Sequence, residues 1–202
     1  MRRNRSGFST LELLLSLAIV ALIVAGVAGG LRIGRQVWRA DRISEGRGEI
    51  EAAARALSLL LERCVPATAA RGGQGPALVF SGQSHDLAFV YMSEGANQWG
   101  GHILARLGID PESPGKLTLW TGVFRPQTVW STGAQDLQKA DVLEGVTRFE
   151  IDYFGADPGQ PPTWRPDWMG RERLPKLVRI RIERQRDGRS LSVEFIANLR
   201  LA

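Results

Sequence analysis

The first pattern along the chain is a long run of apolar residues. From Leu13 to Leu31 the chain carries no charged residue. A helix rises about 1.5 Å per residue, so about 20 apolar residues cross the roughly 30 Å of hydrocarbon in a bilayer. The run therefore predicts a membrane-spanning helix.

The helical pattern continues beyond this run. Apolar residues recur at three- and four-residue spacing on one helix face, and polar residues lie on the other face. The apolar positions are Ile50, Ala53, Ala54, Leu57, Leu60, Leu61 and Cys64, and the polar positions are Glu51, Arg55, Ser58 and Glu62. Pro66 is expected to stop the helix, because proline lacks the amide hydrogen that a helix needs. The pattern predicts one long N-terminal helix with an amphipathic second half, and Cys64 as a buried structural thiol.

Further along the chain the period of the apolar residues becomes two, which is typical of strands. The segment 68–76, rich in Ala and Gly, is expected to be a loop before them. The expected strands include Leu87–Tyr91, Leu117–Trp120 and Phe149–Tyr153. The clearest is a hairpin in which Val178, Ile180 and Ile182 precede an Asp187-Gly188 turn, and Leu191, Val193 and Phe195 follow it.

One long helix followed by antiparallel strands predicts an α+β fold, with the amphipathic half of the helix packed on one face of the sheet. The expected segments are a leader peptide at 1–7, a transmembrane and assembly helix at 8–31, an amphipathic continuation at 32–65, and a β-rich globular domain at 66–202. A chain of 202 residues has room for one such domain. Core or interface positions are expected for Trp120, Trp130, Trp164 and Trp168.

The charge of the chain changes this picture little. The net charge is +5, but the arginines are scattered through every segment. A solvated basic surface explains this distribution better than a nucleic-acid site does. The single cysteine cannot form an internal disulfide, so it leaves the redox compartment open.

A short motif precedes the apolar run. After three arginines in the first five residues come Gly7-Phe8-Ser9-Thr10-Leu11-Glu12. An acid is costly in hydrocarbon unless its charge is neutralised, so Glu12 indicates a pairing or functional site. Cleavage after Gly7 would free the amine of Phe8 as a cation about one helical turn from Glu12.

This motif resembles the cleavage and methylation motif of type IV pilins and type II secretion pseudopilins. The resemblance implies a pilin-like fold, with a prepilin peptidase that cuts after Gly7 and methylates the new N-terminal Phe8, and with Glu12 supporting filament assembly. It also implies a single-pass inner-membrane protein with a cytoplasmic N-terminus and a periplasmic domain. Two alternatives stay open: a secretory signal peptide cleaved near Ala25–Ala28, and a simple signal anchor.

A second resemblance covers Thr147 to Glu183. A strand at Phe149–Phe154, Trp164 and Trp168 in a Pro-rich loop, and a Leu174-Pro175 step into the next strand are similar to minor pseudopilins of the general secretion pathway protein J class. The tryptophans are expected to fix the loop, and the Leu-Pro step to set how the chain enters the strand.

Motifs for chemistry are not found in the sequence. We find no phosphate-binding loop, nucleophile elbow or Cys-x-x-Cys pair. His85 and His102 have no partner at a metal-binding helical spacing, and Asp152, Asp157 and Asp167 match no calcium loop. We therefore expect no catalytic residues, no cofactor and no assigned metal.

The expected function is that of a minor pseudopilin, a structural subunit at the tip of the type II secretion pseudopilus that supports protein export across the outer membrane. The resemblance implies as partners other minor pseudopilins, the major pseudopilin, the prepilin peptidase and the inner membrane. We expect no small-molecule substrate and no nucleic acid. The alternatives are a minor pilin of a type IV pilus or DNA-uptake system, and a membrane-tethered envelope hydrolase that uses His85 and Asp86.

Overall fold

We describe the fold from a computed structural model. The structure describes residues 46–71, 74–94 and 100–199. The predicted leader, the apolar run Leu13–Leu31 and the first part of the predicted continuation, 32–45, lie outside these residues.

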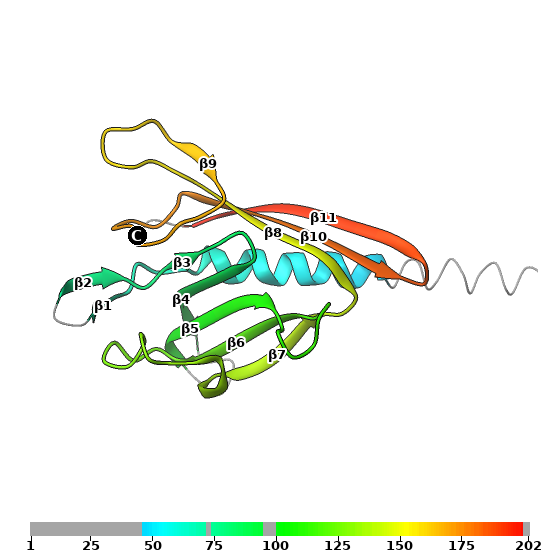
Figure 1. The fold of residues 1–202 in the computed structure, drawn as a ribbon, viewed down its shortest axis with the longest axis horizontal. Coiled ribbons are helices and arrows are strands. Elements are labelled where there is room, and N and C mark those ends of the chain that lie inside the picture. The colour runs from blue at the N-terminus through cyan, green and yellow to red at the C-terminus, as the bar shows by residue number, and fades with distance from the viewer. Residues whose placement is uncertain (1–45, 72–73, 95–99, 200–202) are drawn as a thin grey trace, which may run out of the picture. The chain divides into compact units, whose positions relative to one another are not determined.

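The described strands form three antiparallel sheets (Figure 1). The four-stranded sheet has the order β11-β10-β8-β9, the five-stranded sheet has the order β3-β4-β5-β6-β7, and β1 pairs with β2. The strand bounds are β1 Thr68–Arg71, β2 Gln74–Leu78, β3 Ser81–Gly82, β4 Asp86–Glu94, β5 Gly100–Ile109, β6 Leu117–Val123, β7 Gln138–Leu143, β8 Val146–Gly155, β9 Thr163–Arg165, β10 Leu177–Arg186 and β11 Arg189–Asn198. A short 3-10 helix, η1, covers Ala134–Asp136.

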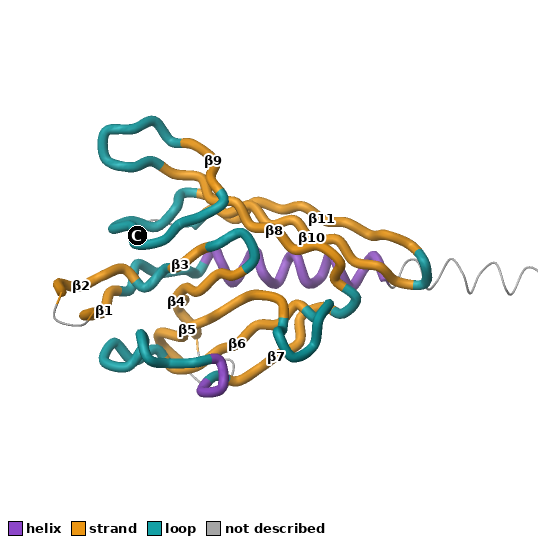
Figure 2. Tube along the Cα trace, in the orientation of Figure 1, coloured by secondary structure: helices purple, strands orange, loops and turns teal. Residues whose placement is uncertain are grey.

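Residues 46–62 form an α-helix that lies between the two larger sheets (Figures 1 and 2). Ile50, Leu57 and Leu61 of the helix belong to one buried cluster with inward side chains of both sheets. The helix ends with tight turns, in which the Arg63 N–H donates to the Leu60 carbonyl at 3.2 Å and the Cys64 N–H to the Leu61 carbonyl at 3.0 Å. The predicted apolar face of this helix and its end before Pro66 are therefore confirmed.

The predicted α+β fold class is wrong. The described part of the chain is predominantly β, with strands from β1 to β11 in three antiparallel sheets and one α-helix, at residues 46–62. The helix packs between two sheets instead of on one. The error arose because alternation reveals only strands with one solvated face, whereas β5 buries Ile103, Leu104 and Ala105 in succession.

The predicted localisation also needs correction. Among the residues that the structure describes, no helix is both long enough and apolar enough to cross a membrane. The helix at 46–62 carries Glu49, Glu51 and Arg55 on its polar face, which suits a helix packed on one side against a core. The structure therefore does not support the assignment to the inner membrane as a single-pass protein.

The predicted hairpin is confirmed as β10 and β11. Its register pairs Ile180 with Phe195 and Arg186 with Arg189. Asp187 and Gly188 have φ values of +50° and +73°, as a tight two-residue turn of the mirror-image type requires. The expected strands at Leu87–Tyr91, Leu117–Trp120 and Phe149–Tyr153 lie within β4, β6 and β8.

The predicted loop at 68–76 is wrong, since most of it forms the hairpin of β1 and β2. This hairpin and the segment around Val129 cover part of the outer face of the five-stranded sheet. A second buried cluster lies there, formed by Ala69, Val79, Val90, Leu104 and Val129. The five-stranded sheet therefore packs on both faces, and its strands are less amphipathic than β8 and β10.

Candidate functional site

The residues expected to act in processing and assembly cannot be placed. Gly7, Phe8 and Glu12 lie outside the described residues.

The candidate hydrolase pair is held in structural contacts. The His85 ring donates from Nδ1 to the Phe149 carbonyl at 2.6 Å, and Asp86 forms an ion pair with Arg106 at 2.9 Å. The nearby Ser84 hydroxyl donates to the Pro166 carbonyl at 3.3 Å, so it is not aimed at His85 as a nucleophile would be. The Ser84 and His85 contacts connect the β3–β4 loop to the region of the four-stranded sheet, and the Asp86 ion pair joins β4 to β5.

Cys64 is buried, with 3% of its surface exposed. Burial raises the pKa of its thiol to about 12, because the thiolate would lose its hydration. The reactive form is the thiolate, so this side chain behaves as a structural residue. The prediction of a buried structural thiol is confirmed.

Two of the three aspartates that were considered as calcium ligands, Asp152 and Asp157, contact arginines. Asp152 forms ion pairs with Arg179 and Arg181 at 2.7 and 2.6 Å, and Asp157 forms one with Arg165 at 2.8 Å. Within the described ranges no group of three or more His, Cys, Asp or Glu side chains is arranged to hold a metal ion. Asp152 joins β8 to β10, and Asp157 joins the loop after β8 to Arg165 of β9.

The ion pairs of Asp152 belong to a network on the outer face of the four-stranded sheet. Arg181 of β10 contacts Glu150 and Asp152 of β8 and Glu194 of β11, at 2.9, 2.6 and 3.0 Å. Arg148 contacts Glu150 at 2.7 Å and holds the pKa of that carboxyl below its usual range. The network joins three strands and keeps its side chains in defined positions.

Apolar side chains adjoin this network at one corner of the same face. The Trp164 ring of β9 packs on Phe154 of β8, with 5.2 Å between centroids, and the Arg179 guanidinium lies 4.4 Å from the Trp164 ring centroid. Ile196 of β11 is also exposed on this side. Rigid aromatic and arginine side chains beside a satisfied polar rim are typical of protein-binding surfaces.

Trp168 has a different role, although it lies only four residues from Trp164. It is 2% exposed, and its indole N–H donates to the Arg173 carbonyl at 2.8 Å. Its backbone exchanges two hydrogen bonds with Gly82 of β3, at 3.0 and 2.8 Å. Trp168 therefore fixes the loop between β8 and β10 against the five-stranded sheet.

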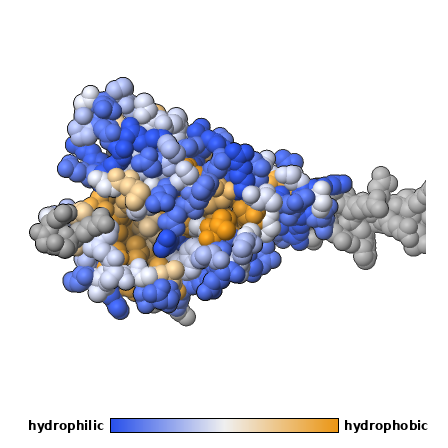
Figure 3. Space-filling model, in the orientation of Figure 1, coloured by the Kyte–Doolittle hydropathy of each residue, from blue (hydrophilic) through white to orange (hydrophobic). Residues whose placement is uncertain are grey.

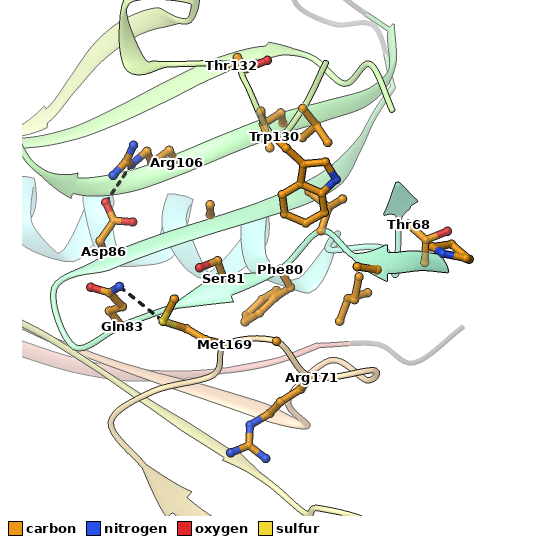
Figure 4. Close-up of a pocket in the computed structure, with 18 of the residues that line it drawn as sticks. Thr68, Phe80, Ser81, Gln83, Asp86, Arg106, Trp130, Thr132, Met169 and Arg171 are labelled. Atoms are coloured by element: carbon orange, nitrogen blue, oxygen red, sulfur yellow. Dashed lines mark hydrogen bonds and ion pairs between the residues drawn. The ribbon is translucent and has the colours of Figure 1, made fainter. Parts of the chain in front are cut away.

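An open cleft of about 700 Å³ lies on the outer side of β3, β4 and β5 (Figure 4). In Figure 4 Phe80 and Ser81 lie between Trp130 and Met169, and the ion pair of Asp86 with Arg106 lies toward one end. The Gln83 amide donates to the Met169 sulfur at 3.4 Å. The lining of the cleft mixes apolar side chains such as Trp130 and Met169 with polar ones such as Ser81, and Asp86 is neutralised by its ion pair with Arg106.

The surface of the protein separates hydrophobic from hydrophilic regions on the face shown in Figure 3. In Figure 3 hydrophobic residues reach the surface in the hollow between the two sheets, and hydrophilic residues cover most of the rest of the face shown. Sequence reasoning missed the cleft residues Trp130 and Met169 as neighbours, because they come from loops far apart in the chain. The alternating charged residues of β8 and β10 are visible in the sequence and indicate a charged outer face. Which charged residues pair with each other follows only from the register of the two strands.

No protein-family model and no curated protein sequence matches the chain.

Proposed function

We propose that the chain is a minor pseudopilin of a type II secretion system, a structural subunit that supports protein export by joining related subunits at the tip of a filament. The observation that carries the proposal is the motif Gly7-Phe8-Ser9-Thr10-Leu11-Glu12 with its following apolar run. Gly7 is the cleavage residue, Phe8 the methylated residue and Glu12 the assembly residue in this proposal.

The body supports the proposal through its surfaces. The ion-pair network on the outer face of β8, β10 and β11 and the corner of Trp164, Phe154 and Arg179 present ordered side chains for a partner. An ordered surface loses little side-chain entropy on binding, which favours protein contacts. The partners we propose are other minor pseudopilins, the major pseudopilin and a prepilin peptidase.

The region similar to general secretion pathway protein J also has a structural basis for its tryptophans. Trp168 anchors the loop between β8 and β10, and Trp164 stands on its surface. This arrangement supports a loop that holds its shape while it presents an aromatic ring to a partner. The proposal therefore places one contact at Trp164 and none at Trp168.

The decisive experiment is mass spectrometry of the N-terminus after production of the chain together with a prepilin peptidase. We expect a mature chain that begins at N-methylated Phe8. A Gly7→Leu variant is the control and should keep its leader. A wild-type chain that keeps Met1 with active peptidase present, or that begins near residue 29, would overturn the proposal.

Two further assays distinguish a pseudopilin from the alternative functions. Salt-dependent binding of the purified chain to DNA would favour a DNA-uptake pilin, although Arg148, Arg165 and Arg181 are engaged in ion pairs. Hydrolase activity that disappears in His85→Ala would favour an envelope hydrolase. The proposal expects neither result.

A further inference from the structure

The outermost strand of the four-stranded sheet, β11, has a free edge in the described part of the chain. It is ten residues long and pairs with β10 without a bulge. The opposite edge strand of the same sheet, β9, has three residues. Protein edge strands are normally shortened, bulged or protected by Lys or Pro, because an unpaired edge recruits other strands. β11 has no bulge, Lys or Pro among Arg189–Asn198, and its two charged residues are Arg189 beside the turn and Glu194, which is paired with Arg181.

The hydrogen bonds identify the backbone groups that face outward. The Leu199 N–H donates to the Lys176 carbonyl at 3.2 Å, and Arg186 pairs with Arg189 across the two-residue turn. The odd-numbered residues of β11 therefore bond to β10, because bonding direction alternates along a strand. The N–H and C=O groups that point away from β10 belong to Ser190, Ser192, Glu194, Ile196 and Asn198.

The inward side chains of β11 are also incompletely covered. Leu191, Val193 and Phe195 are half-buried, whereas Ile180 and Ile182 on the neighbouring strand are 0% exposed. Val193 and Phe195 contact the main core cluster at its margin. A further strand beside β11 would cover these three apolar side chains and extend the core.

The order of residues in β11 favours a second copy of the same strand. A two-fold axis at Val193 places Val193 opposite its own copy, and Leu191 opposite Phe195 of the other copy. On the outer face Glu194 then lies opposite Ser192. All three apolar side chains meet apolar side chains, and no like charges meet.

Other registers between two copies of β11 would bring less favourable side chains together. An axis at Glu194 brings two glutamates together, which is unfavourable for directly opposed strands. An axis at Ser192 places Phe195 opposite Arg189. A shift by one residue would pair inward side chains with outward ones.

From these observations we propose that two copies of this chain associate through antiparallel pairing of their β11 strands about a two-fold axis at Val193. The contact joins two four-stranded sheets into one continuous sheet and is isologous, with the same residues on both sides. This contact does not rest on the proposed function.

Disulfide trapping of the purified full chain tests the register. In the proposed pair the two copies of residue 193 form a non-hydrogen-bonded pair with a Cα separation of about 4.5 Å, which a disulfide can bridge. Val193→Cys should form a covalent dimer on mild oxidation. Ser190→Cys is the matched control on the same strand, and its two copies lie roughly 20 Å apart in the proposed pair, so it should form no covalent dimer. Cys64 is buried and should not react in either variant.

Sedimentation velocity of the full chain tests the association itself. Wild type should form a dimer as its concentration rises, and Val193→Lys should have half that mass under the same conditions, because two buried ammonium groups would oppose each other at the axis. Circular dichroism checks that Val193→Lys is folded. Wild type that stays monomeric with no Val193→Cys dimer would overturn the proposal. So would a dimer that survives Val193→Lys, equal trapping of Ser190→Cys, or association only with a different subunit.

Discussion

The four-stranded sheet leaves its outer face to solvent, whereas the five-stranded sheet covers part of its outer face with β1, β2 and the segment around Val129. On the first sheet, Arg181 and its carboxylate partners occupy the outer face. On the second sheet, Val90 and Leu104 occupy the corresponding positions and belong to a second buried cluster. The two sheets share one core, but in the described part of the chain the outer face of the four-stranded sheet is lined by ordered ion pairs, whereas that of the five-stranded sheet is partly covered.

The two sheets are joined at a junction formed by Trp168. Trp168 comes from the loop of the four-stranded sheet and pairs with Gly82 of the five-stranded sheet. Its ring also packs closely on Gly155 at the end of β8. Changes at this junction should therefore affect both sheets, and changes on the open face should affect neither strongly.

The largest effect is expected from Trp168→Ala. Removing this buried ring leaves a cavity where the loop meets both sheets, and we expect the free energy of unfolding to fall by about 3–5 kcal/mol. Trp164→Ala is the matched control on the open face, where the ring is 37% exposed, and should cost about 1 kcal/mol. Urea denaturation measures both. Equal losses would contradict the division between an anchoring and a surface tryptophan.

Gly155→Ala should have the next largest effect. An added methyl group at this position would overlap the buried ring of Trp168, and relieving the overlap should cost about 1–3 kcal/mol of stability. Gly48→Ala is the control, because a methyl group there meets nothing within 4 Å. On a helix that change should stabilise the protein by about 0.5–1 kcal/mol. A thermal-unfolding shift in the same direction for both variants would show that the packing at Gly155 is looser than described.

Polar substitutions on the outer faces of the two sheets should differ in their cost to stability. Val90→Thr places a hydroxyl in the second buried cluster and should cost about 1–3 kcal/mol. Ile196→Thr makes the same kind of change on the open face and should change stability by no more than about 0.5 kcal/mol. Both are measured by urea denaturation in dilute solution. Similar costs would mean that the face of β11 is covered in the protein.

The smallest effect is a pH dependence at the turn after β5. The Lys139 ammonium, aided by the Glu112 N–H, holds the pKa of the Asp110 carboxyl below its ordinary value of 3.8. A lowered pKa in the folded state means that Asp110 contributes stability above pH 3.8, and that the contribution is lost as the pH falls through the folded-state pKa. Wild type should therefore exceed Asp110→Asn in stability near neutral pH, with a difference that shrinks in acid.

Glu112→Gln provides the control for this pH series, because it removes an exposed carboxylate from the same turn. Its difference from wild type should vary less with pH than that of Asp110→Asn. A difference for Asp110→Asn that stays constant down to pH 2 would show that the ion pair with Lys139 contributes nothing to stability.

The same comparison explains which strands could be predicted. β8 and β10 have one buried and one solvated face, so Phe149, Ile151 and Val178 alternate visibly with charged residues. β5 buries side chains on both faces, and β7 exposes most of its side chains, so neither leaves a clear alternation. The α+β prediction failed because only part of the strands was visible in this way.

The surface residues were predictable only in part. Charged residues such as Arg179 and Asp152 were visible as an outer face, but their ion pair joins positions far apart in the sequence and depends on the register of β8 with β10. The sequence offered no means to separate Trp168 from Trp164, since both lie in one Pro-rich loop. Their difference in burial depends on where that loop meets Gly82.

By itself the sequence determined the apolar helix face that includes Ile50, Leu57 and Leu61, and the hairpin turned by Asp187 and Gly188. Both follow from local physics, because one face of each element avoids water and a two-residue turn needs positive φ values. Only the tertiary structure decided that the helix lies between two sheets, that β1 and β2 pair, and that β11 is left as an edge. Those outcomes depend on contacts between segments that are distant in the sequence. A local pattern of residues gives no information on the free energy of such contacts.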